Sequence, residues 1–306
     1  MNFVLNKLYE NGNKRRNNPP ADGALTEYKA PQKTIPLPEG IGSESDVRYE
    51  TGDGLSLMTD ILFPEKVKAN EKLPILVTIH GGALVFGDRK LNQAFRVKMA
   101  ELGYLVYSLE YRLLMETDFF GEMSDICHGL QFVKETAKKY HGDTDRIYVM
   151  GESAGALLAL YAAAMTESDT IRDRIGVFCP KLKVRGLIFS SGMLYTTRAD
   201  YIGLIYKKDL YGERRKDKEF IKYMNPEDPE VMQSLPDICL TAGYGDFLRN
   251  VTLRYAKALE KAGHPSLLLD YDAKEKLPHA FVTLAPYLEE SRDAIKRIHE
   301  WILNLE

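Results

Sequence analysis

Hydrophobic positions recur along this chain as short, nearly continuous runs that alternate with longer stretches of mixed character. The runs are LPILVTI (73–79), YLVYSLEY (104–111), RIYVM (146–150), KVRGLIFS (183–190), DICLTAG (237–243) and SLLLDYD (266–272). Such runs, rich in Ile, Leu and Val, are typical of strands buried on both faces of a parallel sheet. Ahead of them, SDVRYETG (45–52) and LSLMTDILFP (55–64) alternate polar and apolar residues around Asp53-Gly54, which predicts two paired strands joined by a turn.

Helical patterns separate these runs. They cover about 120–140, the segment AGALLALYAAAM (154–165), the amphipathic segment VTLRYAKALEKAG, which ends at Gly263, and 288–305. Glycine at that position is a natural C-terminal cap. Strands that alternate with helices predict an α/β fold with a mostly parallel central sheet flanked by helices.

Two segments interrupt the alternation. Residues 1–42 are rich in helix breakers apart from a short helix expected in the first ten residues, and they form an N-terminal arm and candidate cap. Residues 43–306 make up the α/β domain, within which 194–235 is a polar, charged and tyrosine-rich insertion, a candidate lid. Its tyrosines are Tyr195, Tyr201, Tyr206, Tyr211 and Tyr223. We expect them to pack the insertion onto the domain rather than to stack on a ligand.

Composition narrows the class of protein. With 44% hydrophobic and 28% charged residues and a net charge of −3, the chain is an ordinary globular protein that is not suited to bind nucleic acid. Cys127, Cys179 and Cys239 are widely spaced, so we expect buried thiols in a reducing compartment. The N-terminus lacks a signal-type apolar core, and the longest apolar run, 156–165, is too short to span a membrane. These features predict a cytoplasmic protein.

The segment MGESAGALLAL (150–160) contains the chain's strongest chemical motif. Gly-x-Ser-x-Gly occurs by chance in roughly one chain in ten of this length, but here a strand precedes it and a helix follows. A sharp strand-to-helix turn projects Ser153 outward, while Gly151 and Gly155 leave room for the neighbouring backbone. The start of the helix favours developing negative charge. The plainer interpretation is that Ser153 only caps the helix.

A serine nucleophile needs a base and a group that orients the base. Asp246 follows the fifth buried run, and His279 lies in the loop after the last one, so the order is serine, acid, histidine. The competing acids, Asp270 and Asp272, sit on or beside the last strand, and the histidines at 128, 141, 264 and 299 fall at unsuitable places. Asp246 and His279 are therefore the predicted partners of Ser153.

Hydrolysis through a tetrahedral intermediate also needs donors for the oxyanion, worth about 3–4 kcal/mol each. The loop TIHGGALVFGD (78–88) follows the first buried run, and its Gly81 and Gly82 N–H groups join that of Ala154 in the predicted oxyanion hole. His80 is expected to brace this loop. Because these features occur together in the required order, Ser153 is interpreted as a nucleophile rather than a helix cap.

The spacing of HGG, GESAG, GDFL and PHAF resembles the hormone-sensitive-lipase-like branch of the α/β-hydrolases, as do YRL (111–113) and DTDRIYVMGESAGALLAL. The resemblance covers roughly residues 45–305. It implies the α/β-hydrolase fold, in which we expect the N-terminal arm and the 194–235 insertion to form a small lid. It also implies hydrolysis of carboxylic esters through an acyl-enzyme, without metal or cofactor, by Ser153, Asp246 and His279.

Two departures from the family pattern concern the acyl group. The oxyanion loop reads HGGAL, where the family usually has HGGG and an aromatic residue, and Glu152 precedes the nucleophile where Asp is more common. The chain has no room for the propeller or large cap of related peptidases. We therefore expect a serine carboxylesterase acting on small short-chain esters. A carbohydrate-ester (acetyl or feruloyl) esterase and a non-catalytic hydrolase-fold ligand-binding protein remain alternatives, and a homodimer is left open.

Overall fold

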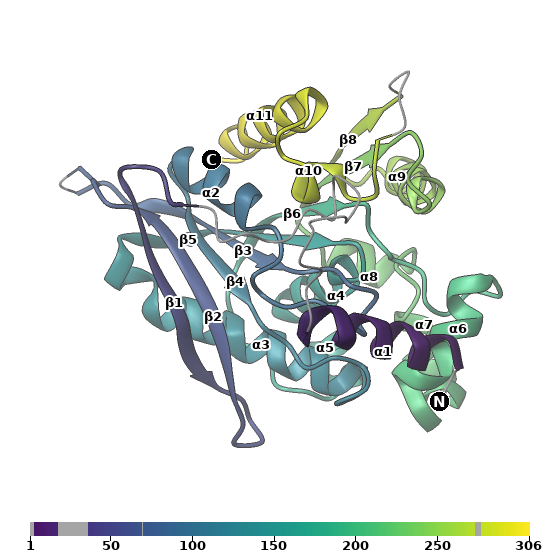
Figure 1. The fold of residues 1–306 in the computed structure, drawn as a ribbon. Coiled ribbons are helices and arrows are strands. Elements are labelled where there is room, and N and C mark those ends of the chain that lie inside the picture. Colours follow the sequence, from purple (N-terminus) through teal and green to yellow (C-terminus); the bar gives the residue numbers. More distant parts are fainter. Residues whose placement is uncertain (1–2, 18–35, 69, 273–276) are drawn as a thin grey trace.

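The computed structural model describes residues 3–17, 36–68, 70–272 and 277–306. In this part of the chain, eight strands form one sheet in the order β1-β2-β4-β3-β5-β6-β7-β8 (Figure 1). The strands are β1 (Ile41–Glu50), β2 (Ser56–Pro64), β3 (Leu73–Ile79), β4 (Leu105–Leu109), β5 (Gly142–Glu152), β6 (Val184–Ser190), β7 (Asp237–Gly243) and β8 (Ser266–Tyr271). β1 and β2 form an antiparallel hairpin, and β2 pairs antiparallel with β4. The remaining strands, β4, β3, β5, β6, β7 and β8 in sheet order, run parallel to one another. The predicted hairpin and all six buried runs are confirmed.

The helices cover both faces of the sheet. They are α1 (Phe3–Asn17), α2 (Gln93–Glu101), α3 (Phe119–Thr136), α4 (Gly155–Glu167), α5 (Asp169–Ile175), α6 (Tyr201–Tyr211), α7 (Lys218–Tyr223), α8 (Pro229–Gln233), α9 (Arg249–Ala262), α10 (Phe281–Leu284) and α11 (Glu289–Leu303), with short 3₁₀ turns at Ala137–Tyr140 and Gly212–Lys216. One core cluster takes side chains from α3, α4 and α9, and the other from α2, α10 and α11. The four predicted helices are α3, α4, α9 and α11, and Gly263 caps α9 in the left-handed conformation, φ 66°. The α/β-hydrolase fold is thereby confirmed.

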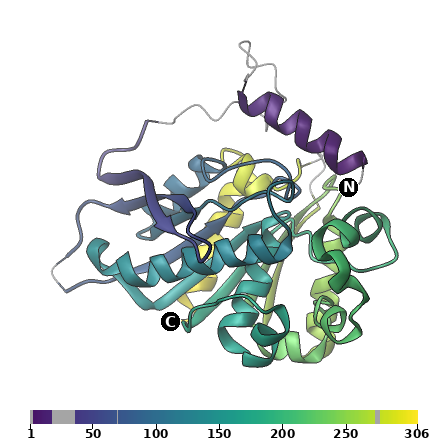
Figure 2. The same cartoon turned by 90° about the horizontal axis from the view of Figure 1, so that it is seen from below.

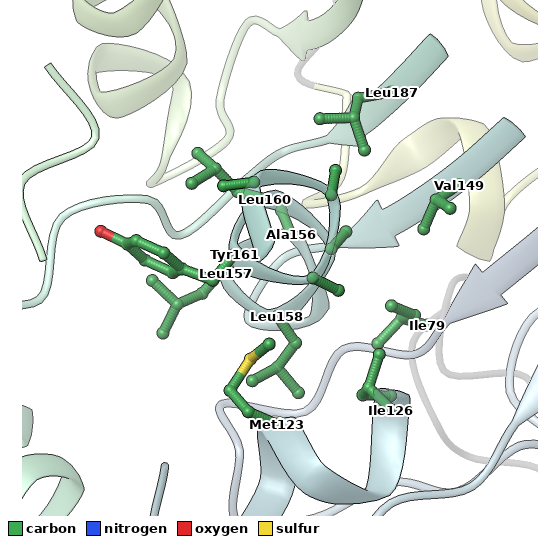
Figure 3. Packing of buried hydrophobic residues seen from close by; sticks show 14 of the residues in the cluster. Ile79, Met123, Ile126, Val149, Ala156, Leu157, Leu158, Leu160, Tyr161 and Leu187 are labelled. Atoms are coloured by element: carbon green, nitrogen blue, oxygen red, sulfur yellow. The ribbon is translucent and has the colours of Figure 1, made fainter. Parts of the chain in front are cut away.

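Helix α4 lies in the middle of the first core. Every residue from Gly155 to Met165 is buried, as expected for a helix that is apolar on all sides. Figure 3 shows its side chains between the sheet residues Val149 and Leu187 on one side and Met123 of α3 on another. Helix α4 therefore packs between the central sheet and α3.

The 194–235 insertion folds into α6, the 3₁₀ turn at Gly212–Lys216, α7 and α8. Four of its five predicted packing tyrosines are buried: Tyr195, Tyr206, Tyr211 and Tyr223. Tyr201 is different, because 73% of its surface is exposed. The expected packing role is confirmed for the four buried tyrosines.

Helix α1 lies beside this insertion in both views (Figures 1 and 2). Its Leu5 is fully buried in the main core cluster, and the helix extends to Asn17, beyond the ten residues expected. Residues 18–35 of the predicted arm lie outside the described residues, and a capping role for 1–42 stays a prediction.

The cysteines and the membrane expectation can also be compared with the structure. Cys127, Cys179 and Cys239 are buried free thiols, as expected. Among the described residues, no helix combines the length and the apolar character needed to cross a bilayer.

Candidate active site

Ser153 lies in the turn between β5 and α4, and its backbone is strained. Its φ is 49°, in the left-handed region that non-glycine residues rarely adopt. Two backbone hydrogen bonds hold this conformation: Ser153 N–H donates to the Ser190 carbonyl, 2.8 Å, and Met193 N–H donates to the Ser153 carbonyl, 2.8 Å. Strain of this kind at a strand-to-helix turn is typical of a nucleophile presented to substrate.

The two glycines of the motif allow close backbone approach. A Cβ on Gly151 would lie 2.4 Å from the Cα of Ala156. A Cβ on Gly155 would lie 2.4 Å from the Ile79 carbonyl oxygen and 2.5 Å from that of His80. The second glycine therefore lets the start of α4 touch the end of β3, where the glycine loop begins.

Asp246 and His279 form a hydrogen-bonded pair. His279 Nδ1 lies 2.8 Å from Asp246 Oδ1, and the Asp246 side chain is fully buried. Leu248 N–H donates to the same oxygen, 2.8 Å. Burial raises the pKa of the Asp246 carboxyl. The hydrogen bond to His279 and the charge of His279 lower this pKa by more than burial raises it, so the net pKa falls below the usual value. An ionised Asp246 holds the proton of His279 on Nδ1, so Nε2 is free to act as a base.

The competing residues are engaged elsewhere. Asp270 accepts two hydrogen bonds from Arg249, each 2.8 Å, and Asp272 is exposed. His128, His264 and His299 contact Ser124, Leu235 and Tyr104, respectively. Asp246 is therefore the acid that the structure places beside His279.

Hydrogen bonds connect the His279 loop to the nucleophile turn. The Ala280 N–H donates to Ser191 Oγ, 3.0 Å, directly after the Ser190 carbonyl that anchors Ser153. Within the described residues, Ser153 and His279 themselves form no direct hydrogen bond. Catalytic hydrogen bonds often tighten only once substrate is bound.

Glu152 provides a second connection that the sequence did not reveal. Its Oε2 accepts a hydrogen bond from Thr283 Oγ1, 2.7 Å, and another from Asn92 Nδ2. Burial raises the pKa of this carboxyl, and the two hydrogen bonds and the charge of His279 oppose the rise. Glu152 thus joins the nucleophile turn to α10, just after His279, and to the residue that precedes α2.

The glycine loop lies against Ser153. A Cβ on Gly81 would lie 3.1 Å from the Cβ of Ser153 and 2.5 Å from Glu152 Oε1. In the described part of the chain, no hydrogen bond is donated by the N–H groups of Gly81, Gly82 and Ala154, the predicted oxyanion donors. His80 is buried and stacks on Tyr111, with ring centroids 4.2 Å apart, in keeping with a bracing role.

One exposed aromatic ring borders His279. The Phe247 ring lies 4.4 Å from the His279 ring, centroid to centroid, although 74% of Phe247 is exposed. No group of three or more His, Cys, Asp or Glu residues in the described ranges is arranged to hold a metal ion. A serine beside a histidine–aspartate pair is an arrangement that can perform acyl transfer.

Known proteins share this sequence pattern and fold. The chain is 28% identical over 257 residues to a probable isoprenylcysteine alpha-carbonyl methylesterase from Oryza sativa subsp. japonica, which covers 80% of this chain and 60% of that protein. It is 33% identical over 213 residues to an isoprenylcysteine alpha-carbonyl methylesterase from Arabidopsis thaliana. The matched region covers 66% of this chain and 49% of that protein. The chain thus spans only half to three fifths of these relatives.

Solved structures agree on the fold. Esterase B from Lactobacillus rhamnosis superposes with a TM-score of 0.81 at 21% identity, covering 99% of this chain and 96% of that one. Esterase LipW from Mycobacterium marinum gives 0.70 at 20% identity, covering 98% and 90%. The BD-FAE family model matches residues 59–235, more than half of the chain. With the α/β-hydrolase fold and this match, the chain belongs to the BD-FAE family.

Proposed function

We propose that this protein is a serine carboxylesterase that hydrolyses short-chain acyl esters through an acyl-enzyme intermediate. One observation carries the proposal: strained Ser153 lies beside the glycine loop, and hydrogen bonds link its turn to the loop that bears His279 paired with Asp246. These are the parts that acyl transfer requires.

The steps follow from this placement. His279 Nε2 takes the proton of Ser153 as the serine oxygen bonds to the ester carbonyl carbon. The N–H groups of Gly81, Gly82 and Ala154 hold the oxyanion. The intermediate collapses, the bond to the alcohol oxygen breaks, and His279 returns the proton to the leaving alkoxide. Water then repeats the sequence on the acyl-enzyme and releases the acid, with Asp246 orienting His279 throughout.

The substrate is proposed to be a small ester. The methylesterase names of the plant relatives concern a small alcohol group, and one structure of Esterase B contains a tributyrin phosphonate inhibitor. A carbohydrate-ester esterase of the same fold is the second candidate. Of the five insertion tyrosines, Tyr201 alone is exposed enough to stack on a sugar or aryl ring. A cytoplasmic location and a homodimer stay predictions.

The test is steady-state hydrolysis of p-nitrophenyl esters from acetate to dodecanoate by wild type, Ser153→Ala and His279→Ala. We expect activity that falls with acyl length, and a loss of about a thousandfold or more in each variant with the fold intact. Activity retained in either variant would refute the mechanism. Acetylated sugars and simple methyl esters, compared at equal concentration, separate the two substrate classes. A wild type that binds an ester without turnover would favour the binding-protein alternative.

A further inference from the structure

The loop that carries the predicted oxyanion donors has an unusual backbone. Three consecutive residues have positive φ: Gly82 at 113°, Ala83 at 56° and Leu84 at 61°. Glycine adopts this region freely, whereas Ala83 and Leu84 carry a Cβ that disfavours it. Two hydrogen bonds inside residues 80–87, the oxyanion loop, hold this conformation, from the N–H groups of Val85 and Phe86 to the Gly82 carbonyl, 3.0 Å each, and contacts from outside the loop add to them.

Three hydrogen bonds from other elements hold the carbonyl groups of the oxyanion loop. Tyr111 donates its hydroxyl to the His80 carbonyl, 3.0 Å, and Leu114 N–H donates to the Leu84 carbonyl, 2.7 Å. Both donors belong to the segment after β4. The third bond comes from the insertion: the Tyr206 hydroxyl donates to the Ala83 carbonyl, 2.9 Å.

Tyr206 is well placed to fix the loop. It lies on α6 with 5% of its surface exposed, so water competes little for its hydrogen bond. The neighbouring Ile205 and Leu210 of α6 are also buried, and Asp200 caps the helix by accepting a hydrogen bond from Gly203 N–H, 3.0 Å. Because a peptide unit is planar, fixing the Ala83 carbonyl also fixes the plane shared by Ala83 and Leu84.

We propose that Tyr206 is a positioning residue for ester hydrolysis: its hydroxyl holds the Ala83 carbonyl so that the N–H groups of Gly81 and Gly82 stay directed at the oxyanion. The inference rests on the proposed function and adds the insertion to the parts that set the reaction rate. Tyr206 acts on the loop and does not contact the reacting atoms. Since oxyanion donors must lie about 2.7–3.1 Å from the oxygen, a small rotation of the loop weakens them.

Tyr206→Phe tests this by removing only the hydroxyl. We expect kcat to fall roughly tenfold while KM changes less than twofold, because the lost interaction is made in the transition state. A trifluoromethyl ketone forms an adduct when the Ser153 oxygen adds to its carbonyl carbon, which places an oxyanion in the hole. Tyr206→Phe should bind this ketone more weakly by the same factor. Tyr223→Phe is the matched control, since that hydroxyl donates to Glu230 inside the insertion, 2.7 Å, and its removal should leave kcat unchanged.

Amide hydrogen exchange gives a readout that does not depend on turnover. Peptides that span residues 81–87 should exchange faster in Tyr206→Phe and at the wild-type rate in Tyr223→Phe. Wild-type kcat in Tyr206→Phe, a loss confined to KM, a loss shared by Tyr223→Phe, or unchanged exchange would each overturn the inference. If one of these outcomes occurs while wild type is active and Ser153→Ala is inactive, the inference about Tyr206 fails and the proposed function stands. If wild type shows no serine-dependent hydrolysis, the proposed function fails and the inference with it.

Discussion

Gly155→Ala should lower kcat by about two orders of magnitude while it lowers the free energy of unfolding only moderately. The new Cβ would lie 2.4 Å from the Ile79 carbonyl oxygen and 2.5 Å from that of His80. Ordinary contact begins near 3.4 Å, so the start of α4 and the end of β3 must separate by about 1 Å. Ser153 lies on one side of this contact, and the oxyanion loop begins on the other.

The two effects differ in size. Overpacking of this kind costs about 1–3 kcal/mol, and the better helix propensity of alanine offsets up to about 1 kcal/mol of it. A displacement of about 1 Å between a nucleophile and its oxyanion donors lowers the rate about a hundredfold. The free energy of unfolding should therefore fall by about 1–2 kcal/mol, while kcat falls by about two orders of magnitude.

Urea unfolding and hydrolysis of p-nitrophenyl acetate measure the two quantities on the same samples. Ala159→Gly, in the middle of α4 and fully buried, is the control. It loses a similar free energy of unfolding, about 1–2 kcal/mol, through helix propensity and a lost methyl contact. It leaves the end of β3 in place, so its kcat should stay within about twofold of wild type. A Gly155→Ala variant whose kcat stays within about threefold would show that the close approach does not set the site geometry.

Two further predictions concern buried carboxyl groups. Asp246→Asn should lower kcat by about four orders of magnitude with little change in KM, because the amide no longer favours a proton on Nδ1 of His279. Asp270→Asn is the control, since it loses only an ion pair to Arg249 and should keep its kcat. Equal losses of kcat in the two variants would mean that the acid is misassigned. Burial raises the pKa of the Glu122 carboxyl well above its usual value, as do the nearby Asp125 and Asp118 charges, and among the described residues neither of its oxygens has a hydrogen-bond partner. A raised folded-state pKa means that the stabilising contribution is complete below the unfolded pKa, about 4.3, and is lost as pH rises toward the folded pKa, by about 1.4 kcal/mol per pH unit. Thermal unfolding of wild type at pH values from about 4.3 upward should show this loss and Glu122→Gln should lack most of it, whereas parallel pH profiles would mean that Glu122 is ionised in the folded protein.

The elements that could be predicted from the sequence are those with a strong local pattern. The buried β-strands are recognisable from apolar runs, and the long helices α3, α4, α9 and α11 from helical patterns of apolar residues. Helix α2 lacks a recognisable start, because its N-cap residue Asn92 has the left-handed conformation and makes no side-chain capping hydrogen bond. The strand order depends on pairings between distant segments, which no local pattern encodes.

The same distinction applies to the candidate site. Ser153, Asp246 and His279 could be proposed because each follows a recognisable strand, and parallel strands bring their carboxyl ends to one edge. The bonds from Thr283 to Glu152 and from Tyr206 to Ala83 join residues more than 120 positions apart. The tyrosine-rich insertion was a signal for packing, but nothing in it singled out Tyr206 as the residue that reaches the oxyanion loop.

The strained turn at Ser153 also bears on how the protein is made. Both backbone anchors of that turn, the Ser190 carbonyl and the Met193 N–H, lie about 40 residues further along the chain. A nascent chain on the ribosome does not have both partners until residue 193 has emerged and β6 has paired with β5. The strained conformation of Ser153 is thus acquired only after β6 is made, and if Ser153 is the nucleophile, a growing polypeptide does not present it before the sheet around it has formed.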